Sequence, residues 1–207
     1  MKKTAFGLVG LAILIFFLII LGFILNSGGA SLVGICILLG FLIKSMDQFI
    51  DEPRYKKYRI LIAPFAVIIP LTIGYLAYVH DPVFGMVIGT ALGLILTGKI
   101  DHPAFIIGII GFIIIIVILV LAGGLEIAIT SIYIIPFAFI GCFADEIGHE
   151  KMSERTQPKS LKLFFEHRFA LKIAAVICTV LGFAQVIHLV AFLCFDIAYD
   201  ITAISLR

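Results

Sequence analysis

The feature that most constrains the fold of this chain is a series of long apolar runs. Residues 104–122 read AFIIGIIGFIIIIVILVLA and contain no polar side chain. A helix of about 20 apolar residues is long enough to cross the hydrocarbon core of a bilayer. Lipid offers no partner to backbone N–H and C=O groups, so a helix, which satisfies them internally, is favoured there. The sequence therefore predicts an all-α, polytopic membrane protein.

The composition supports this fold class. The 207 residues are 62% hydrophobic and only 14% charged, whereas soluble domains have about 25% charged residues. A net charge of +2 gives no basic excess that would favour nucleic acid as a partner. The four cysteines all fall inside apolar runs, which is typical of reduced packing residues rather than of a disulfide framework or a zinc site.

The apolar runs predict seven transmembrane helices in a single transmembrane domain, residues 1–207. We interpret them as three helical hairpins, 5–46, 59–100 and 104–144, followed by a last helix, 168–195. The first run is longer than the core of about 7 to 15 residues that a signal peptide needs, so we expect it to be retained as a span. The individual spans are 5–26, 29–46, 59–79, 83–100, 104–122, 125–144 and 168–195.

The distribution of basic residues predicts the orientation. In the seven-helix arrangement, 14 of the 15 Lys and Arg residues fall on the side of the N-terminus, and only Arg207 falls on the other. Short cytoplasmic connections carry an excess of Lys and Arg. We therefore expect a multi-pass protein of the cell membrane, with a cytoplasmic N-terminus and an extracytoplasmic C-terminus.

Acidic residues mark the ends of the second, fourth and sixth predicted spans, at Asp47, Asp101 and Asp145. The separations are about one hairpin each, which indicates a weak internal repeat. Even-numbered spans all end on the same side of the membrane, so we expect these acids to lie close together. Asp51 and His149 each follow by four residues and would share a helical face with Asp47 and Asp145.

This cluster predicts a divalent-metal site. A carboxylate at the C-terminal end of a helix meets the negative pole of the macrodipole, at a cost of about 0.3 to 1 kcal/mol. A bound cation would compensate, and carboxylate-rich sites favour Mg²⁺ or Mn²⁺ over Zn²⁺. The predicted ligands are Asp47, Asp51, Asp101, His102, Asp145 and His149, and the predicted phosphate-binding or lipid-binding residues are Lys44, Lys99 and Arg168.

Each part of the cluster also has a structural interpretation. Asp47 and Asp51 could form a solvated turn paired with Lys44. Asp101 or His102 could cap the fifth helix, which begins near Pro103. The acids and histidine of residues 145–150 could be solvated surface. In the connection 145–167, residues 161–165 are predicted to lie on the inner membrane surface.

Three classes of function remain open. The acids and bases fit a metal-dependent enzyme that acts on the phosphate or diphosphate of a lipid. A cation or small-solute transporter or channel is an alternative, in which His188, expected deep in the last span, would lie along the path. A structural or assembly protein is the third. The sequence contains no HExxH, GxSxG, GxxxxGK[ST], GxGxxG or CxxC motif, so it identifies no catalytic residue and leaves enzymatic activity undecided.

Overall fold

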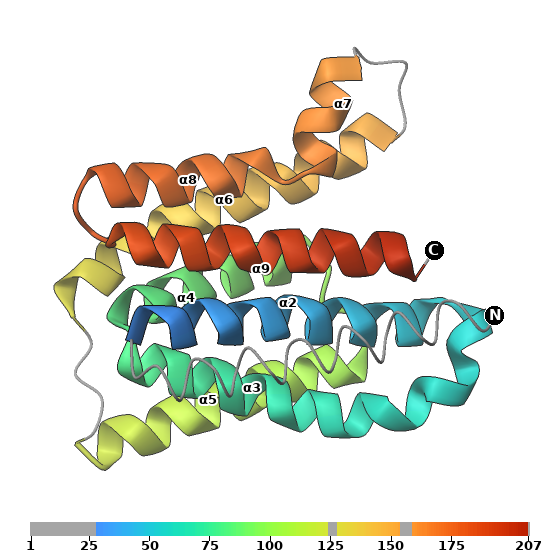
Figure 1. Cartoon of the computed structure of the whole chain (residues 1–207), viewed down its shortest axis with the longest axis horizontal. Coiled ribbons are helices and arrows are strands. Elements are labelled where there is room, and N and C mark those ends of the chain that lie inside the picture. Colours follow the sequence, from blue (N-terminus) through green and yellow to red (C-terminus); the bar gives the residue numbers. More distant parts are fainter. Residues whose placement is uncertain (1–27, 124–127, 154–158, 207) are drawn as a thin grey trace. The chain divides into compact units, whose positions relative to one another are not determined.

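The computed structural model describes residues 28–123, 128–153 and 159–206, and over these residues the fold is all-helical (Figure 1). The first predicted span, 5–26, lies outside the described residues. The elements are α2 (Gly28–Asp51), the 3₁₀ helix η1 (Pro53–Leu61), α3 (Ile62–Val79), α4 (Asp81–Leu96), α5 (Pro103–Leu121), α6 (Ile129–Ser153), α7 (Lys159–Glu166), α8 (Phe169–Val180) and α9 (Val186–Ser205).

Five stretches within this described part of the chain are long and apolar enough to cross a membrane. The helices α4 and α8 are apolar but shorter. Most exposed large side chains are hydrophobic, as expected where lipid replaces water. The structure thus confirms the all-helical class and contains five candidate membrane spans among the described residues; it does not confirm the predicted seven spans or their hairpins. These spans are Gly29–Asp51, Pro53–Val79, Pro103–Leu121, Ile129–Lys151 and Val186–Ser205.

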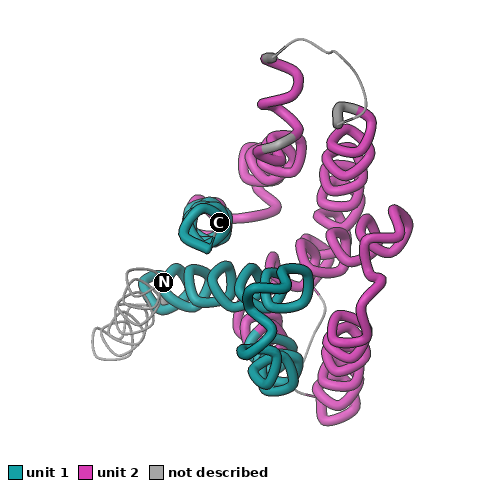
Figure 2. The backbone as a smooth tube through the Cα atoms, turned by 90° about the vertical axis from the view of Figure 1, so that its right-hand side faces the viewer, with its two compact units in different colours: residues 1–72, 190–207 teal, residues 73–189 magenta. Residues whose placement is uncertain are grey.

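The helices form two compact units, coloured separately in Figure 2. Unit 1 comprises residues 1–72 and 190–207 and includes α2, η1 and most of α9. Within it, α2 passes very close to α9: a Cβ atom added at Gly40 would lie 2.2 Å from the carbonyl oxygen of Phe195. Small residues permit this kind of backbone approach between helices in membranes.

Unit 2, residues 73–189, is built around α6. Gly85, Gly89 and Gly93 of α4 face α6, and a Cβ atom at Gly89 would lie 2.4 Å from the carbonyl oxygen of Ile135. The contacts of these glycines advance along α6 in the same direction as along α4, so the two helices run parallel. On another side of α6, Gly141 lies against α8. The α6 helix therefore has close neighbours on two sides.

The segment 168–195, predicted as one helix, is instead two helices separated by a turn at residues 181–185. Gly182 has φ +78°. Its N–H donates to the carbonyl of Thr179 at 3.1 Å, and the N–H of Phe183 donates to the carbonyl of Cys178 at 2.9 Å. This pattern is a Schellman C-cap, which ends α8. His188 consequently lies in the first turn of α9, not deep within a span.

The break also changes where the C-terminus lies. Within unit 1, the hydroxyl of Tyr55 donates to the carbonyl oxygen of Leu206 at 2.8 Å. Tyr55 belongs to the basic connection that follows α2. Leu206, the last described residue, therefore lies beside this connection, whereas the sequence predicted that the two would be on opposite sides. The turn between α8 and α9, which the sequence prediction lacked, adds one helix to the predicted order and accounts for the difference.

Candidate functional site

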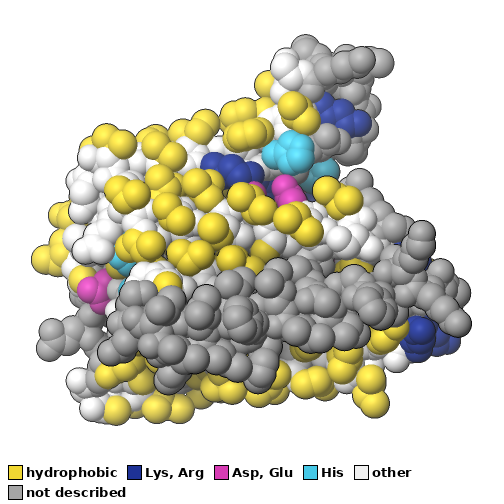
Figure 3. All heavy atoms as spheres, in the orientation of Figure 1, with side chains coloured by type: hydrophobic (Ala, Val, Ile, Leu, Met, Phe, Trp, Pro, Cys, Tyr) yellow, Lys and Arg dark blue, Asp and Glu magenta, His cyan; other side chains and the backbone are white. Residues whose placement is uncertain are grey.

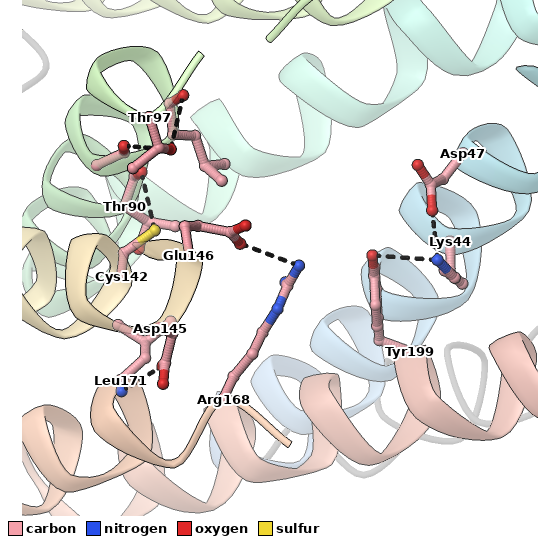
Figure 4. Close-up of polar contacts among 12 residues, drawn as sticks. Lys44, Asp47, Thr90, Thr97, Cys142, Asp145, Glu146, Arg168, Leu171 and Tyr199 are labelled. Carbon is pink, nitrogen blue, oxygen red and sulfur yellow. Dashed lines mark hydrogen bonds and ion pairs between the residues drawn. The ribbon is translucent and has the colours of Figure 1, made fainter. Parts of the chain in front are cut away.

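The C-terminal half of α2 holds a local polar cluster within unit 1. Lys44 forms an ion pair with Asp47 one turn further along the helix. The Lys44 ammonium also donates to the hydroxyl of Tyr199 at 3.4 Å and lies 4.9 Å from the centroid of its ring. Figure 4 shows Lys44 directed toward both partners. Two predicted site residues, Lys44 and Asp47, therefore help to join α2 to α9.

The helix α2 continues to Asp51, so Asp47 and Asp51 share a helical face as the spacing predicted. Arg59 of η1 lies against the end of this helix. Its Nη2 donates to the carbonyl of Ile50 at 3.1 Å, and its Nε donates to the carbonyl of Phe49 at 3.4 Å. These cationic donors satisfy carbonyls that the helix itself leaves without a partner. Arg59 thus compensates part of the negative pole of α2.

Asp145 has the most specific environment among the predicted ligands. It is 2% exposed. One carboxylate oxygen accepts from the N–H of Ala170 at 3.0 Å, and the other accepts from the N–H of Leu171 at 2.8 Å (Figure 4). These two N–H groups belong to the first turn of α8. Asp145 therefore caps α8 from a different helix, where its negative charge also favours the positive end of the α8 dipole.

Glu146 and Arg168 form an ion pair beside this cap. The distance between Arg168 Nη2 and Glu146 Oε1 is 3.2 Å, and the exposed fractions of the two side chains are 41% and 7%. Arg168 is the N-cap residue of α8 and adopts a left-handed backbone conformation with φ 51° and ψ 46°. A buried carboxylate is costly unless it is paired, so Arg168 stabilises Glu146 in this position. The sequence placed Glu146 in the acidic group 145–150 but predicted neither its pairing with Arg168 nor the backbone conformation of Arg168.

His102 caps α5, as the alternative interpretation predicted. Its Nδ1 accepts from the N–H of Ala104 at 3.2 Å, and Pro103 occupies the first turn. The neighbouring residues Lys99 and Asp101 are exposed in the connection between α4 and α5. Gly98, with φ +68°, ends α4 just before them. Proline and glycine at these two positions are typical of a helix start and a helix end.

His149 lies on α6, one turn beyond Asp145, because α6 extends to Ser153. The predicted i, i+4 spacing of this pair is therefore present on a continuous helix. Of the six predicted ligands, Asp47 and Asp51 belong to unit 1 and the other four belong to unit 2. Within the described ranges, no three His, Cys, Asp or Glu side chains are grouped closely enough to hold a metal ion.

A corner of unit 2 collects cationic and apolar side chains around the polar end of α8. We define the α7–α8 corner as Leu161, Lys162, Leu163, Arg168 and Lys172. Figure 3 shows Lys, Arg and His side chains over this end of α8, together with acidic side-chain atoms and beside hydrophobic surface. Leu161 and Leu163 are both exposed.

The α7–α8 corner is attached firmly to α6. The ring of Phe165 occupies the space beside Gly148, where an added Cβ atom would lie 2.1 Å from the ring. The rings of Phe164 and Phe169 stack, with centroids 5.6 Å apart. These contacts fix α7 relative to the beginning of α8. The predicted surface stretch at residues 161–165 is therefore part of a short helix held between α6 and α8.

One further contact, between two histidine rings, was not predicted from the sequence. His80, at the start of α4, and His188, at the start of α9, have ring centroids 5.5 Å apart. They meet because the turn at residues 181–185 brings His188 to the end of unit 2 that holds the α3–α4 junction. The Gly182 turn was the sequence signal that could have located this pair.

Comparison of the chain with known protein families, curated proteins and solved structures gives no match.

Proposed function

We propose that this protein binds a lipid through its phosphate or diphosphate group at the α7–α8 corner. The observation that carries the proposal is the composition of this corner, where exposed leucines of α7 adjoin Lys162, Arg168 and Lys172. Apolar side chains beside cations are the combination that an anionic lipid head group and its acyl chains require. The α7 helix would lie in the plane of the membrane surface, with its leucines among the acyl chains.

The proposal does not depend on a bound metal. Asp47 pairs with Lys44, His102 Nδ1 caps α5, and both oxygens of Asp145 accept from α8. Three of the six predicted ligands thus have structural partners, and their donor atoms fit these partners better than a shared ion. Phosphate recognition at the corner instead rests on cationic donors, which bind phosphate oxygens by charge-assisted hydrogen bonds.

The same local partners favour a second candidate, a structural or assembly protein. The Lys44–Asp47–Tyr199 cluster and the Asp145 cap both join helices that are distant in sequence. Under this alternative the acids stabilise the helical bundle, and the corner anchors it to the membrane surface without selecting a lipid. The two candidates differ in whether the corner distinguishes one phosphate-bearing lipid from another.

Lipid selectivity at the corner is the first prediction. The protein in neutral detergent would be titrated with phosphatidylcholine, phosphatidylglycerol or a polyprenyl diphosphate, and bound lipid counted by native mass spectrometry. A lysine near a membrane surface contributes about 1 kcal/mol to anionic lipid binding. The double variant K162Q/K172Q should therefore bind phosphatidylglycerol and the diphosphate roughly 30-fold more weakly.

The matched control is K56Q/K57Q, which removes the same charge from η1 in unit 1. An equal loss in both double variants would contradict a site at the corner, because it would reflect net charge alone. Equal binding of phosphatidylglycerol and the diphosphate would favour the structural candidate. Repeating the titration with Mg²⁺ and with a chelator tests the predicted divalent-metal cofactor, which would be supported by diphosphate binding that requires Mg²⁺.

We also propose that the basic end of the helices faces the cytoplasm and that the chain ends there. The contact between Tyr55 and Leu206 supports this arrangement. Leu206 thereby lies beside the basic residues of η1, and a basic end that faces the cytoplasm agrees with the positive-inside rule. The proposed topology keeps the cytoplasmic basic connections predicted from the sequence but reverses the predicted location of the C-terminus.

Cysteine labelling tests this topology. In a background that lacks the four native cysteines, K56C and S205C should both react with a membrane-impermeant maleimide from the same side of sealed vesicles. G123C, at the α5 end that precedes α6, should react from the opposite side. Labelling of K56C and S205C from opposite sides would contradict the proposed topology.

A further inference from the structure

The contact between His80 and His188 lies at the end of unit 2 remote from the α7–α8 corner. His80 is the N-cap residue of α4. His188 belongs to the first turn of α9, directly after the α8–α9 turn. The two rings pack edge to face, with an interplanar angle of 74°. The pair therefore joins two connections, α3–α4 and α8–α9, that are more than 100 residues apart in the sequence.

The hydrogen bonding of His188 defines its protonation state. The backbone N–H of Gln185 donates to Nδ1 of His188 at 3.2 Å. An accepting Nδ1 carries no proton, so the ring is neutral and its proton is on Nε2. Protonation of Nδ1 would place two N–H groups against each other and would break this bond. The backbone N–H of Gln185 would then lose the partner that holds the α8–α9 turn.

The electrostatic surroundings oppose positive charge on the two rings. Both lie at helix N-termini, where the macrodipoles of α4 and α9 are positive. Each ring, once charged, would also repel the other. Burial lowers the pKa of His80 below its usual value of 6.5, and the carboxylate of Asp81 acts in the opposite direction. Both imidazoles are therefore predicted to be neutral at neutral pH.

The other groups around the pair come from α6 and from the turn itself. Ser131 of α6 donates to the carbonyl oxygen of Asp81 at 2.6 Å. Tyr133 of α6 stacks on Phe183 of the α8–α9 turn, with centroids 5.2 Å apart. Among the described residues, the carboxylate of Asp81 interacts electrostatically with both imidazoles and favours their protonated forms. Glu126, in the connection before α6, lies outside the described residues.

We propose that the His80–His188 contact is a pH-sensitive latch. With both rings neutral, it holds the α8–α9 turn against the start of α4; when either ring gains a proton, the turn is released. The like charges of the two rings and the positive ends of the two helices act in this direction, and the carboxylate of Asp81 acts against it. The latch is independent of lipid binding at the α7–α8 corner.

The pH range follows from the direction of the shift at His80. The closed form binds a proton less readily than an open form in which His80 has its usual value of 6.5. The latch is therefore strongest above pH 6.5, and it weakens as the pH falls from 6.5 toward the lower pKa of the closed form. Each unit by which the pKa is lowered corresponds to a tenfold weakening of the closed form at acidic pH.

Hydrogen–deuterium exchange of the whole protein in nanodiscs tests the latch. After correction for the intrinsic pH dependence, exchange in peptides covering 79–84 and 181–190 should rise as the pH is lowered from 7.5 to 5. Peptides from the middle of α6 provide the internal reference. The double variant H80Q/H188Q carries neutral side chains at both positions. Its exchange in these peptides should therefore not rise between pH 7.5 and pH 5, even if its exchange rate differs from that of the native protein at both pH values. We call the rise expected in the native protein the pH-dependent step.

The matched control is H167Q, which removes an exposed histidine at the other end of α8 and should leave the step intact. A step that persists in H80Q/H188Q would overturn the latch, as would exchange in the native protein that stays flat over this range. Unchanged lipid binding by H80Q/H188Q would separate this result from the outcome at the α7–α8 corner.

Discussion

Replacing Gly89 by alanine is expected to destabilise the protein by about 3 kcal/mol, although alanine is the better helix former. The new Cβ atom would lie 2.4 Å from the carbonyl oxygen of Ile135 and 2.7 Å from the Cβ atom of Ala138. The first neighbour is backbone and cannot rotate away. The α4 and α6 helices would have to separate, and the contacts along both would weaken.

The control for this variant is Gly108→Ala on α5, where an added Cβ atom meets nothing within 4 Å. This substitution should be neutral or stabilise the helix by up to about 1 kcal/mol, because it gains helix propensity without a clash. Thermal unfolding of both variants in the same detergent, followed by circular dichroism, measures the difference. Equal stability of the two variants would show that α4 and α6 are not packed closely through Gly89.

The glycine contacts also show how far the sequence predicts the fold. Apolar length alone predicted helices at most of the observed positions, because the bilayer permits few other structures. The close approach of α4 to α6 follows from glycine at every fourth position, 85, 89 and 93, a pattern visible in the sequence. Hydropathy does not detect it, since glycine and its apolar neighbours all belong to one continuous run.

Hydropathy also failed at the α8–α9 turn, for the same physical reason. Gly182 ends α8 through its positive φ angle, but the residues around it are apolar and extend the run. A helix end inside an apolar run is signalled by backbone chemistry rather than by polarity. Missing this turn placed His188 in the middle of a span and separated Leu206 from Tyr55, which are in contact in unit 1. Both errors follow from that one residue.

The candidate site was predicted only in its outline. Helical spacing related Asp145 to His149, and both lie on the continuous helix α6. Asp101, expected at a helix end, lies instead in the connection after α4. The partners of these acids could not be predicted, because the N–H groups that bind Asp145 come from residues 25 and 26 positions later. A carboxylate that caps a helix and one that binds a metal have the same sequence signature, and only the tertiary contacts distinguish them.

Replacing Asp145 by alanine should therefore act first on α8, and we expect a loss of about 2 kcal/mol in the free energy of unfolding. The N–H groups of Ala170 and Leu171 would lose their acceptor at a site where the carboxylate is 2% exposed. Asp145→Asn retains one side-chain oxygen that can accept a single bond, so its stability should fall between those of the native protein and Asp145→Ala.

Two measurements separate this capping role from a metal-binding role. Exchange of the Ala170 and Leu171 amides should accelerate in the order native, Asp145→Asn, Asp145→Ala, because each step removes an acceptor from the same two donors. The exposed Asp101 serves as the control, and Asp101→Ala should leave both amides unchanged. If Asp145 bound a cation instead, Asp145→Asn and Asp145→Ala would lose metal affinity to a similar extent, and the amides of α8 would exchange as in the native protein. The geometry of Asp145, with each oxygen already bonded to an N–H group, makes the graded result the expected one.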